Sequence, residues 1–148
     1  QFSHSYSAMS QSLIQPYLFF GGRCEEALKF YHDAIGAEVL MLMRFKESPH
    51  PVQPGMLAAG FEDKVMHASF RVGQTTLMAS DGSCPEDGNF HGFRLSLSLP
   101  TEVEAERAFT ALAAGGKIDM PLTKTFWSPK FGMLTDRFGL NWMITIPA

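Results

Sequence analysis

An internal duplication constrains the fold of this chain more than any other feature of its sequence. A predicted helix carries an apolar stripe at positions i, i+3, i+4 and i+7, and the same stripe returns 81 positions later. The two stripes are Cys24, Ala27, Leu28 and Tyr31, and Ala105, Ala108, Phe109 and Leu112. Each stripe follows one strand-like segment and precedes three others. The pattern therefore predicts two βαβββ modules and an α+β fold.

The first module is marked out by turn residues. A strand is predicted over 13–20 and a helix over 24–35, which Gly36 stops. Next come a strand over 37–45 and a loop whose three prolines and one glycine forbid regular structure. A hairpin over 65–82 completes the module.

The second module repeats this order without the long proline-rich loop. Its first strand alternates polar and apolar residues in FRLSLSL, and Thr101 and Glu104 then form a capping-box signature. Three more strands are predicted over 117–127, 131–136 and 140–146.

These boundaries predict one domain. It spans 13–148, with modules over about 13–82 and 92–148. Residues 1–12 are expected to be a disordered N-terminus or an artificial remnant, with Met9 as a candidate native start. They lack the Lys/Arg-rich and apolar regions of a secretory signal.

Three stretches carry a resemblance to a known family. They are PYLFFGGRCEEALKFY, then VMHASFRVG followed by MASD, and finally TFWSPKFGMLTDRFGLNWMI. With the paired modules, they resemble the PhnB-like family of the vicinal oxygen chelate superfamily, which includes glyoxalases, bleomycin-binding proteins and extradiol dioxygenases. The resemblance implies curled mixed sheets with helices on their outer faces. It also implies cups that face each other, often across a homodimer.

The resemblance also locates the superfamily's metal ligands, which are His or Glu on the first and last strands of the modules. Here these positions fall at Pro16 or Tyr17, at Ser96, and at Met143, four residues after Gly139. Proline, serine and methionine are not donors for a hard cation or for zinc. The sequence therefore predicts no ordinary metal site. A divalent metal at a displaced site near His67 is the alternative.

Two residues are candidates for acid–base catalysis. His67 shares one face of a predicted strand with Ser69 and Arg71, and Asp81 ends the next strand. Each also has a structural interpretation, because a strand histidine often makes a structural hydrogen bond and an aspartate before glycine often stabilises a turn. Asp136 is expected to be a turn residue rather than an acid catalyst.

Apolar and aromatic side chains are the candidates for a ligand pocket. The thirteen phenylalanines and nine methionines suit an adaptable apolar interior, although most are expected to form the core. The predicted ligand-binding residues are Tyr17, Phe19, Ser69, Met78, Ser96, Trp127, Phe131, Trp142 and Met143. Ser96 and Ser98 face either solvent or a wet cavity, and the resemblance favours the cavity. Arg94 is expected to point outward, with pairing to an anionic ligand as the alternative.

Composition excludes several other classes. The net charge is −3 and no basic run is present, which argues against nucleic acid. No apolar stretch is long enough to cross a membrane. Cys24 and Cys84 form no CxxC pair, and two free thiols fit the cytoplasm. No Rossmann fingerprint, P-loop or GxSxG motif occurs.

Two functional hypotheses follow. The first is a homodimeric, cytoplasmic protein without the usual metal, which binds a small apolar or aromatic molecule in its cup. The second is an enzyme of the lyase, isomerase or dioxygenase type, which uses a displaced metal or His67 and Asp81.

Overall fold

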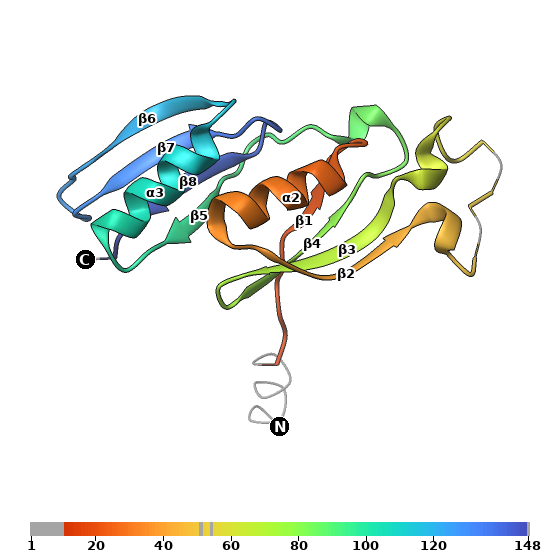
Figure 1. The fold of residues 1–148 in the computed structure, drawn as a ribbon, viewed down its shortest axis with the longest axis horizontal. Helices are drawn as coiled ribbons and strands as arrows, with labels where there is room; N and C mark the ends of the chain where they lie inside the picture. Colours follow the sequence, from red (N-terminus) through yellow and green to blue (C-terminus); the bar gives the residue numbers. More distant parts are fainter. Residues whose placement is uncertain (1–10, 51, 54, 148) are drawn as a thin grey trace, which may run out of the picture.

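A computed structural model describes residues 11–50, 52–53 and 55–147 and confirms the α+β fold of two βαβββ modules (Figure 1). The predictions for residues 1–10 lie outside the described part. The first module contains β1 (Tyr17–Phe19), α2 (Cys24–Ile35), β2 (Glu38–Arg44), β3 (Val65–Val72) and β4 (Thr75–Ser80). The second contains β5 (Leu95–Ser98), α3 (Glu102–Ala113), β6 (Lys117–Thr123), β7 (Phe131–Thr135) and β8 (Asn141–Thr145). Short 3-10 turns lie at Phe45–Glu47, Phe61–Asp63 and Pro85–Asp87.

Each module folds into a four-stranded mixed sheet of the same topology. The strand orders are β1-β4-β3-β2 and β5-β8-β7-β6. The first and last strands of each module pair in parallel, with Tyr17 opposite Met78 in one sheet and Ser96 opposite Met143 in the other. The other pairings are antiparallel. The duplication seen in the sequence is therefore a duplication of the sheets.

Both helices bury the predicted stripes. The eight stripe residues are the buried positions of α2 and α3. Helix α2 ends at Gly36, whose φ of 73° lies in the left-handed region that glycine adopts without strain. The Thr101 side chain accepts a hydrogen bond from the Glu104 backbone N–H, which confirms the predicted cap of α3.

Two predicted strands are shorter than expected. β1 covers three residues of the predicted 13–20, where exposed Leu13 and Ile14 leave the sheet before Pro16. β6 ends at Thr123, because Thr125 and Ser128 close a tight turn by hydrogen bonds between their backbones and through the Thr125 hydroxyl. Both strands were predicted too long, because the apolar residues continue beyond the part of the chain that pairs with a neighbouring strand.

One hydrophobic core joins the two modules. Buried side chains from both sheets and both helices form a single cluster. At its centre the Tyr31 hydroxyl of α2 donates to Asp136 Oδ2 at 2.6 Å, and the Trp142 indole N–H donates to the same oxygen at 2.9 Å. A buried carboxylate of the second module thus holds the helix of the first.

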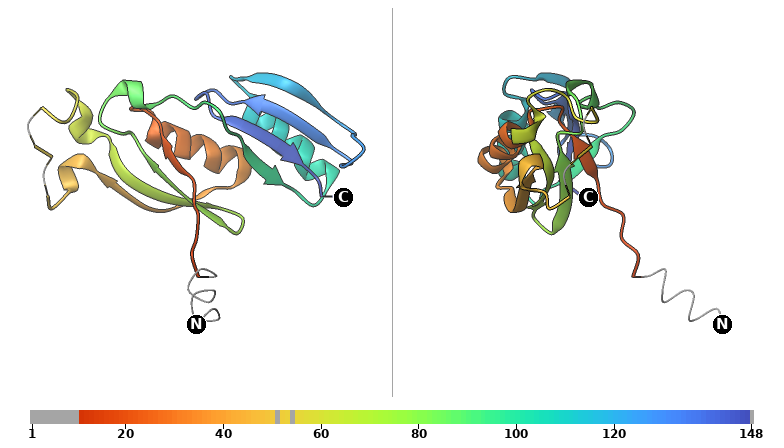
Figure 2. Two further views of the ribbon diagram at one scale, coloured as in Figure 1. Left: turned by 180° about the vertical axis from the view of Figure 1, so that it is seen from behind. Right: turned by 90° about the vertical axis from the view of Figure 1, so that its right-hand side faces the viewer.

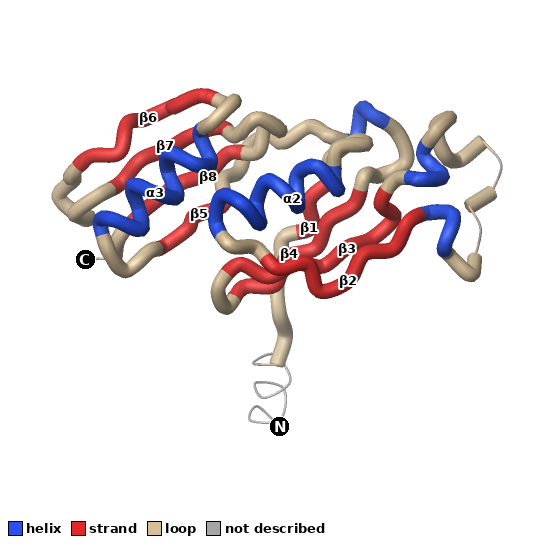
Figure 3. Tube along the Cα trace, viewed as in Figure 1, coloured by secondary structure: helices blue, strands red, loops and turns tan. Residues whose placement is uncertain are grey.

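The sheets lie side by side along the long axis of the molecule, with both helices on one side (Figures 1 and 3). Seen from behind, the strands lie in front of the helices (Figure 2). Each sheet therefore has a core face under its helix and an open face directed away from it. No strand of one sheet pairs with a strand of the other among the described residues.

Candidate functional site

The alternation of buried and open residues separates the two faces of each sheet. Leu18, Ala68 and Ala79 are buried against the helix side, and their strand neighbours point to the opposite face. None of the methionines in the described ranges belongs to the core cluster. The expectation that most methionines form the core was therefore wrong. Several lie in strand positions of the open faces, where their flexible thioethers suit an adaptable apolar surface.

The open face of the first sheet carries an exposed aromatic pair. Tyr17 and Phe19 are 40% and 42% exposed, and their rings stack with centroids 5.0 Å apart. Met78 lies opposite Tyr17 in the sheet, and Ser69 and Met41 continue the same row across β3 and β2. Four of the predicted ligand residues, namely Tyr17, Phe19, Ser69 and Met78, therefore gather on one surface.

His67 belongs to the same surface. Its Nδ1 lies 2.9 Å from the Tyr17 hydroxyl oxygen. The centroids of the two rings are 5.6 Å apart, and their planes are tilted by 46°. The Tyr17 side chain thus reaches from β1 across β4 to β3. Burial, followed by the neighbouring Cys24 thiol, raises the pKa of Tyr17, and its hydroxyl is protonated at neutral pH.

Asp81 lies apart from this surface, in the interior. Its Oδ1 accepts backbone N–H groups from Gly22 and Cys24 at 2.7 and 2.8 Å, and its Oδ2 accepts that of Val65 at 2.8 Å. Only 1% of the residue is exposed. The carboxylate caps the start of α2 and ties it to β3, so the geometry supports a structural role. Catalysis by Asp81 stays a prediction that this arrangement does not favour.

The open face of the second sheet replaces the aromatic pair with serines. Ser96 and Ser98 are exposed on β5, and Ser96, Met143, Met133 and Met120 form a row across the four strands. Beside β5, a groove of about 740 Å³ runs between the end of α2, the β3–β4 hairpin and α3. Ser96 and Met143 therefore lie on a surface separate from the Tyr17–His67 pair within one chain.

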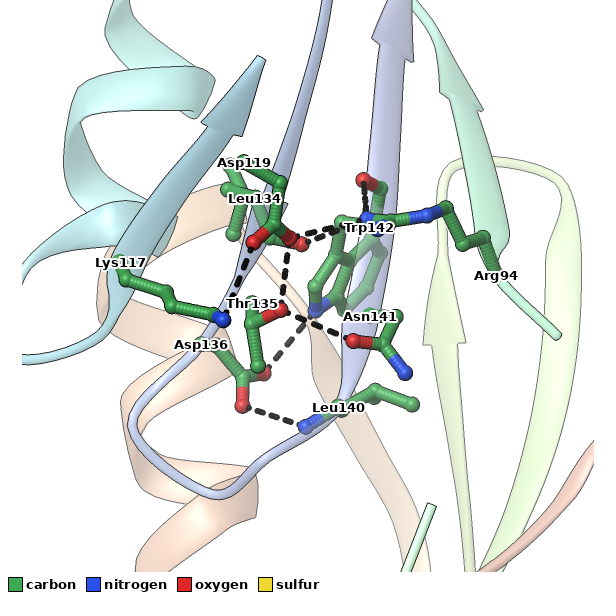
Figure 4. A network of polar contacts seen from close by, with 9 residues as sticks. All are labelled: Arg94, Lys117, Asp119, Leu134, Thr135, Asp136, Leu140, Asn141 and Trp142. Carbon is green, nitrogen blue, oxygen red and sulfur yellow. Dashed lines mark hydrogen bonds and ion pairs between the residues drawn. The ribbon is translucent and has the colours of Figure 1, made fainter. Parts of the chain in front are cut away.

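A polar network occupies one end of this second face (Figure 4). Arg94 Nη1 donates to Asp119 Oδ2 and to the carbonyl oxygens of Leu134 and Trp142, each at 3.2 Å. Thr135 donates to the same Asp119 oxygen at 2.7 Å. The Thr135 bond, with the Arg94 guanidinium, lowers the pKa of Asp119. Arg94 thus cross-links the sheet rather than pointing into solvent, contrary to the expectation.

The remaining predicted residues divide between a loop and the core. Trp127 lies in the β6–β7 loop, 44% exposed, with its ring 5.3 Å from that of buried Phe131. Trp142 is buried on the core face, where it contacts Tyr31 and Asp136. Trp142 also lines a small pocket of about 160 Å³ between the two sheets, together with Pro16 and Ser96.

Asp136 has the turn role that its sequence context indicates, together with a second role. Its Oδ1 accepts the backbone N–H groups of Phe138 and Leu140, and its Oδ2 accepts Tyr31 and Trp142. The turn is readable from Asp-Arg-Phe-Gly. The bond to Tyr31 joins residues 105 positions apart, and no local signal predicts it.

Comparison with known proteins gives the family. The model of the glyoxalase/bleomycin resistance protein/dioxygenase superfamily matches residues 13–144. The chain belongs to this superfamily. Protein YjdN of Escherichia coli K12 is 36% identical over 138 residues, which cover 90% of this chain and 94% of YjdN.

Solved structures place the chain among PhnB-like members. Protein PA1353 of Pseudomonas aeruginosa is 43% identical with a TM-score of 0.79, over 92% of this chain and 98% of that one. A Bacillus cereus PhnB protein, titled a putative 3-demethylubiquinone-9 3-methyltransferase, is 30% identical with a TM-score of 0.70, over 91% and 99%. The suspected PhnB-like membership is confirmed.

The residues at the superfamily's metal positions do not fit a divalent metal. Pro16 offers no side-chain donor and Tyr17 a phenol at the first position, and Ser96 and Met143 supply an alcohol and a thioether. Zinc and hard cations take imidazole, carboxylate or thiolate donors. Within the described ranges, no group of three or more His, Cys, Asp or Glu side chains is arranged to hold an ion. The donor chemistry thus supports neither the usual site nor a displaced one at His67.

Proposed function

We propose that this protein binds a small apolar or aromatic molecule on the open face of its first sheet, without the usual metal. The observation that supports this best is the stacked Tyr17–Phe19 pair, which the described residues leave 40% and 42% exposed. Exposed aromatic and methionine side chains on one face of a sheet suit a planar apolar ligand, because they gain contact area without a fixed shape requirement.

We also propose that the protein acts as a homodimer. Within one chain the two open faces lie side by side, so neither sheet covers the other (Figure 2). A second copy would enclose the aromatic face and remove Tyr17, Phe19 and Met41 from water. Light scattering is expected to give twice the chain mass of 16.4 kDa. A monomer at micromolar concentration would refute this part.

A cytoplasmic location completes the proposal. Its support is the pair of unbonded cysteines, Cys24 and Cys84, because a reducing compartment keeps thiols free. In the described part of the chain, no helix combines the length and apolarity that a bilayer crossing requires.

A probe titration tests the binding function. Isothermal titration with 2-ethylnaphthalene is expected to give saturable binding, and the double variant Tyr17→Ser/Phe19→Ser to weaken it at least tenfold. Phe93→Ser is the matched control, because Phe93 is similarly exposed but lies outside the sheets, and it should bind as the parent does. Equal weakening in both variants would contradict the assignment to this face.

The second candidate is an enzyme, and the Tyr17–His67 hydrogen bond is the observation that favours it. A histidine held by a phenol on an open face is a general acid or base within reach of a ligand. Metal analysis of the purified protein separates the alternatives. A stoichiometric ion that is lost in His67→Ala would favour an enzyme with a displaced metal over the proposed binding function.

A further inference from the structure

Strand β3 presents a line of hydrogen-bond donors on the open face of the first sheet. His67, Ser69 and Arg71 alternate with the buried Ala68 and Phe70. The Cα atoms of successive members are about 6.5 Å apart, because the chain advances by two strand residues from one member to the next. An imidazole, a hydroxyl and a guanidinium therefore lie in a row beside the aromatic pair.

The three donors differ in what they already bind. Arg71 Nη2 pairs with Glu38 Oε2 at 2.7 Å. His67 uses Nδ1 for Tyr17, and the described residues supply no hydrogen-bond partner for its Nε2 or for the Ser69 hydroxyl. The middle of the line, next to Tyr17 and Met78, thus keeps two polar groups available.

The hydrogen bond with Tyr17 favours one of the two neutral tautomers of the His67 imidazole. A phenol is a stronger donor than a neutral imidazole N–H, and the unprotonated ring nitrogen is a stronger acceptor than a phenol oxygen. The favoured arrangement therefore has Tyr17 donating to Nδ1 of His67, with the ring proton on Nε2. His67 then presents its Nε2–H on the edge of the ring that points away from the Tyr17 hydroxyl.

The charges along this line favour an oxygen anion over a cation. Glu38 lies opposite Arg71 on the neighbouring strand β2, and its carboxylate forms an ion pair with the Arg71 guanidinium. One face of the Tyr17 ring is already covered by Phe19, which leaves a single face for a cation. An oxygen placed between His67 and Ser69 would accept from His67 Nε2 and from the Ser69 hydroxyl.

We propose that the first sheet selects planar aromatic anions, with the ring on Tyr17 and Met78 and the anionic oxygen bound by His67 and Ser69. The inference rests on the proposed binding function and narrows its ligand class. His67 is a binding residue in this account, and Tyr17 both supports the ring and fixes the His67 tautomer.

Three isosteric probes test the selection by titration at one pH and ionic strength. 2-Naphthoate carries the anion, 2-naphthylmethylammonium a cation, and 2-ethylnaphthalene neither charge. 2-Naphthoate is expected to bind at least tenfold more tightly than the other two. His67→Gln should reduce this preference, measured as the ratio of the two dissociation constants, to less than threefold. His91→Gln, an exposed histidine of the linker, should keep the full preference.

The outcomes separate this inference from the proposed function. If the three probes bind equally, or the cation binds best, the anion selectivity is refuted while apolar binding stands. If none of the probes binds, both fail. A preference for 2-naphthoate that persists in His67→Gln would refute the role of His67. Tyr17→Phe supplies a second check, because it keeps the ring and should still lower the preference.

Discussion

The two modules share one topology and differ in how each starts its helix and what its edge strand displays. In the first, Asp81 follows the last strand and caps α2 from a distance. In the second, Ile146 takes the equivalent place, and Thr101 caps α3 locally. The backbone N–H of Asp81 donates a hydrogen bond to the carbonyl oxygen of Val65. The backbone N–H of Ile146 donates the equivalent bond to the carbonyl oxygen of Lys130. The scaffold is thus repeated while the side chains have diverged.

The edge strands differ in the same way. β1 directs Tyr17 and Phe19 to the open face, and β5 directs Ser96 and Ser98 there. Both strands pair in parallel with a strand that places a methionine opposite, Met78 or Met143. An aromatic edge strand in one module and a serine edge strand in the other make the two open faces chemically distinct.

Removing the distant cap should have the largest effect. Asp81→Ala leaves three N–H groups without acceptors, two of them buried and one part-buried, so we expect a loss of about 3 kcal/mol of unfolding free energy. Urea denaturation measures it. Ile146→Val, at the equivalent place of the other module, should cost about 1 kcal/mol. Equal losses would refute the asymmetry in capping.

The bond between the modules should come next. Tyr31→Phe removes one donor from the buried Asp136 carboxylate, and we expect a cost of about 2 kcal/mol. Burial, followed by the nearby Asp136 charge, strongly raises the pKa of Tyr31, so its hydroxyl stays a donor throughout the neutral range. Tyr17→Phe makes the same chemical change at a half-exposed site and should cost under about 0.5 kcal/mol. A reversed order of the two losses would contradict the account.

The local cap of the second module should matter less than the distant cap of the first. Thr101→Ala is expected to cost about 1 kcal/mol, because it removes the acceptor for the Glu104 N–H. Thr101→Ser keeps that acceptor and should be close to neutral. If urea denaturation showed a larger loss of stability for Thr101→Ala than for Asp81→Ala, the claim that the distant cap matters more would be contradicted.

The smallest effect is expected on the polar network of the second face. The pKa of Asp119 is lowered by Thr135 and Arg94, so its carboxylate stabilises the fold when ionised. This contribution is complete above the usual aspartate pKa of about 3.9 and disappears as pH falls through the lowered value. Asp119→Asn should therefore lower the melting temperature at pH 7, and this difference should shrink as the pH falls below about 3.9. A difference independent of pH would argue against the ion pair.

The sequence predicts the fold well because its signals are local. Helix stripes, the Gly36 stop and the Thr101 cap each lie within a few residues, and the repeat adds the strand order. The site is harder to predict, because the Tyr17–His67 bond joins positions 50 apart and Asp81 binds residues 57 and 59 positions away. Alternation on β3 did place His67 and Ser69 on one face correctly.

The methionines show why composition alone was misleading. Their abundance suggested an adaptable interior, but none in the described part joins the core cluster, whose residues are aliphatic, aromatic and small. Burial depends on which strand face a residue occupies, and that requires the register. Once Met78 is known to lie opposite Tyr17, its exposure to the open face follows.

Methionine methyl NMR tests the central claim most directly, because these residues mark the open faces. With methyl-labelled methionine and added 2-ethylnaphthalene, the account predicts that Met41 and Met78 shift first, since both lie in the row that contains Tyr17. Met56, exposed in the loop between β2 and β3, should not move. Saturable binding that leaves Met41 and Met78 unshifted would contradict a ligand site on the first sheet.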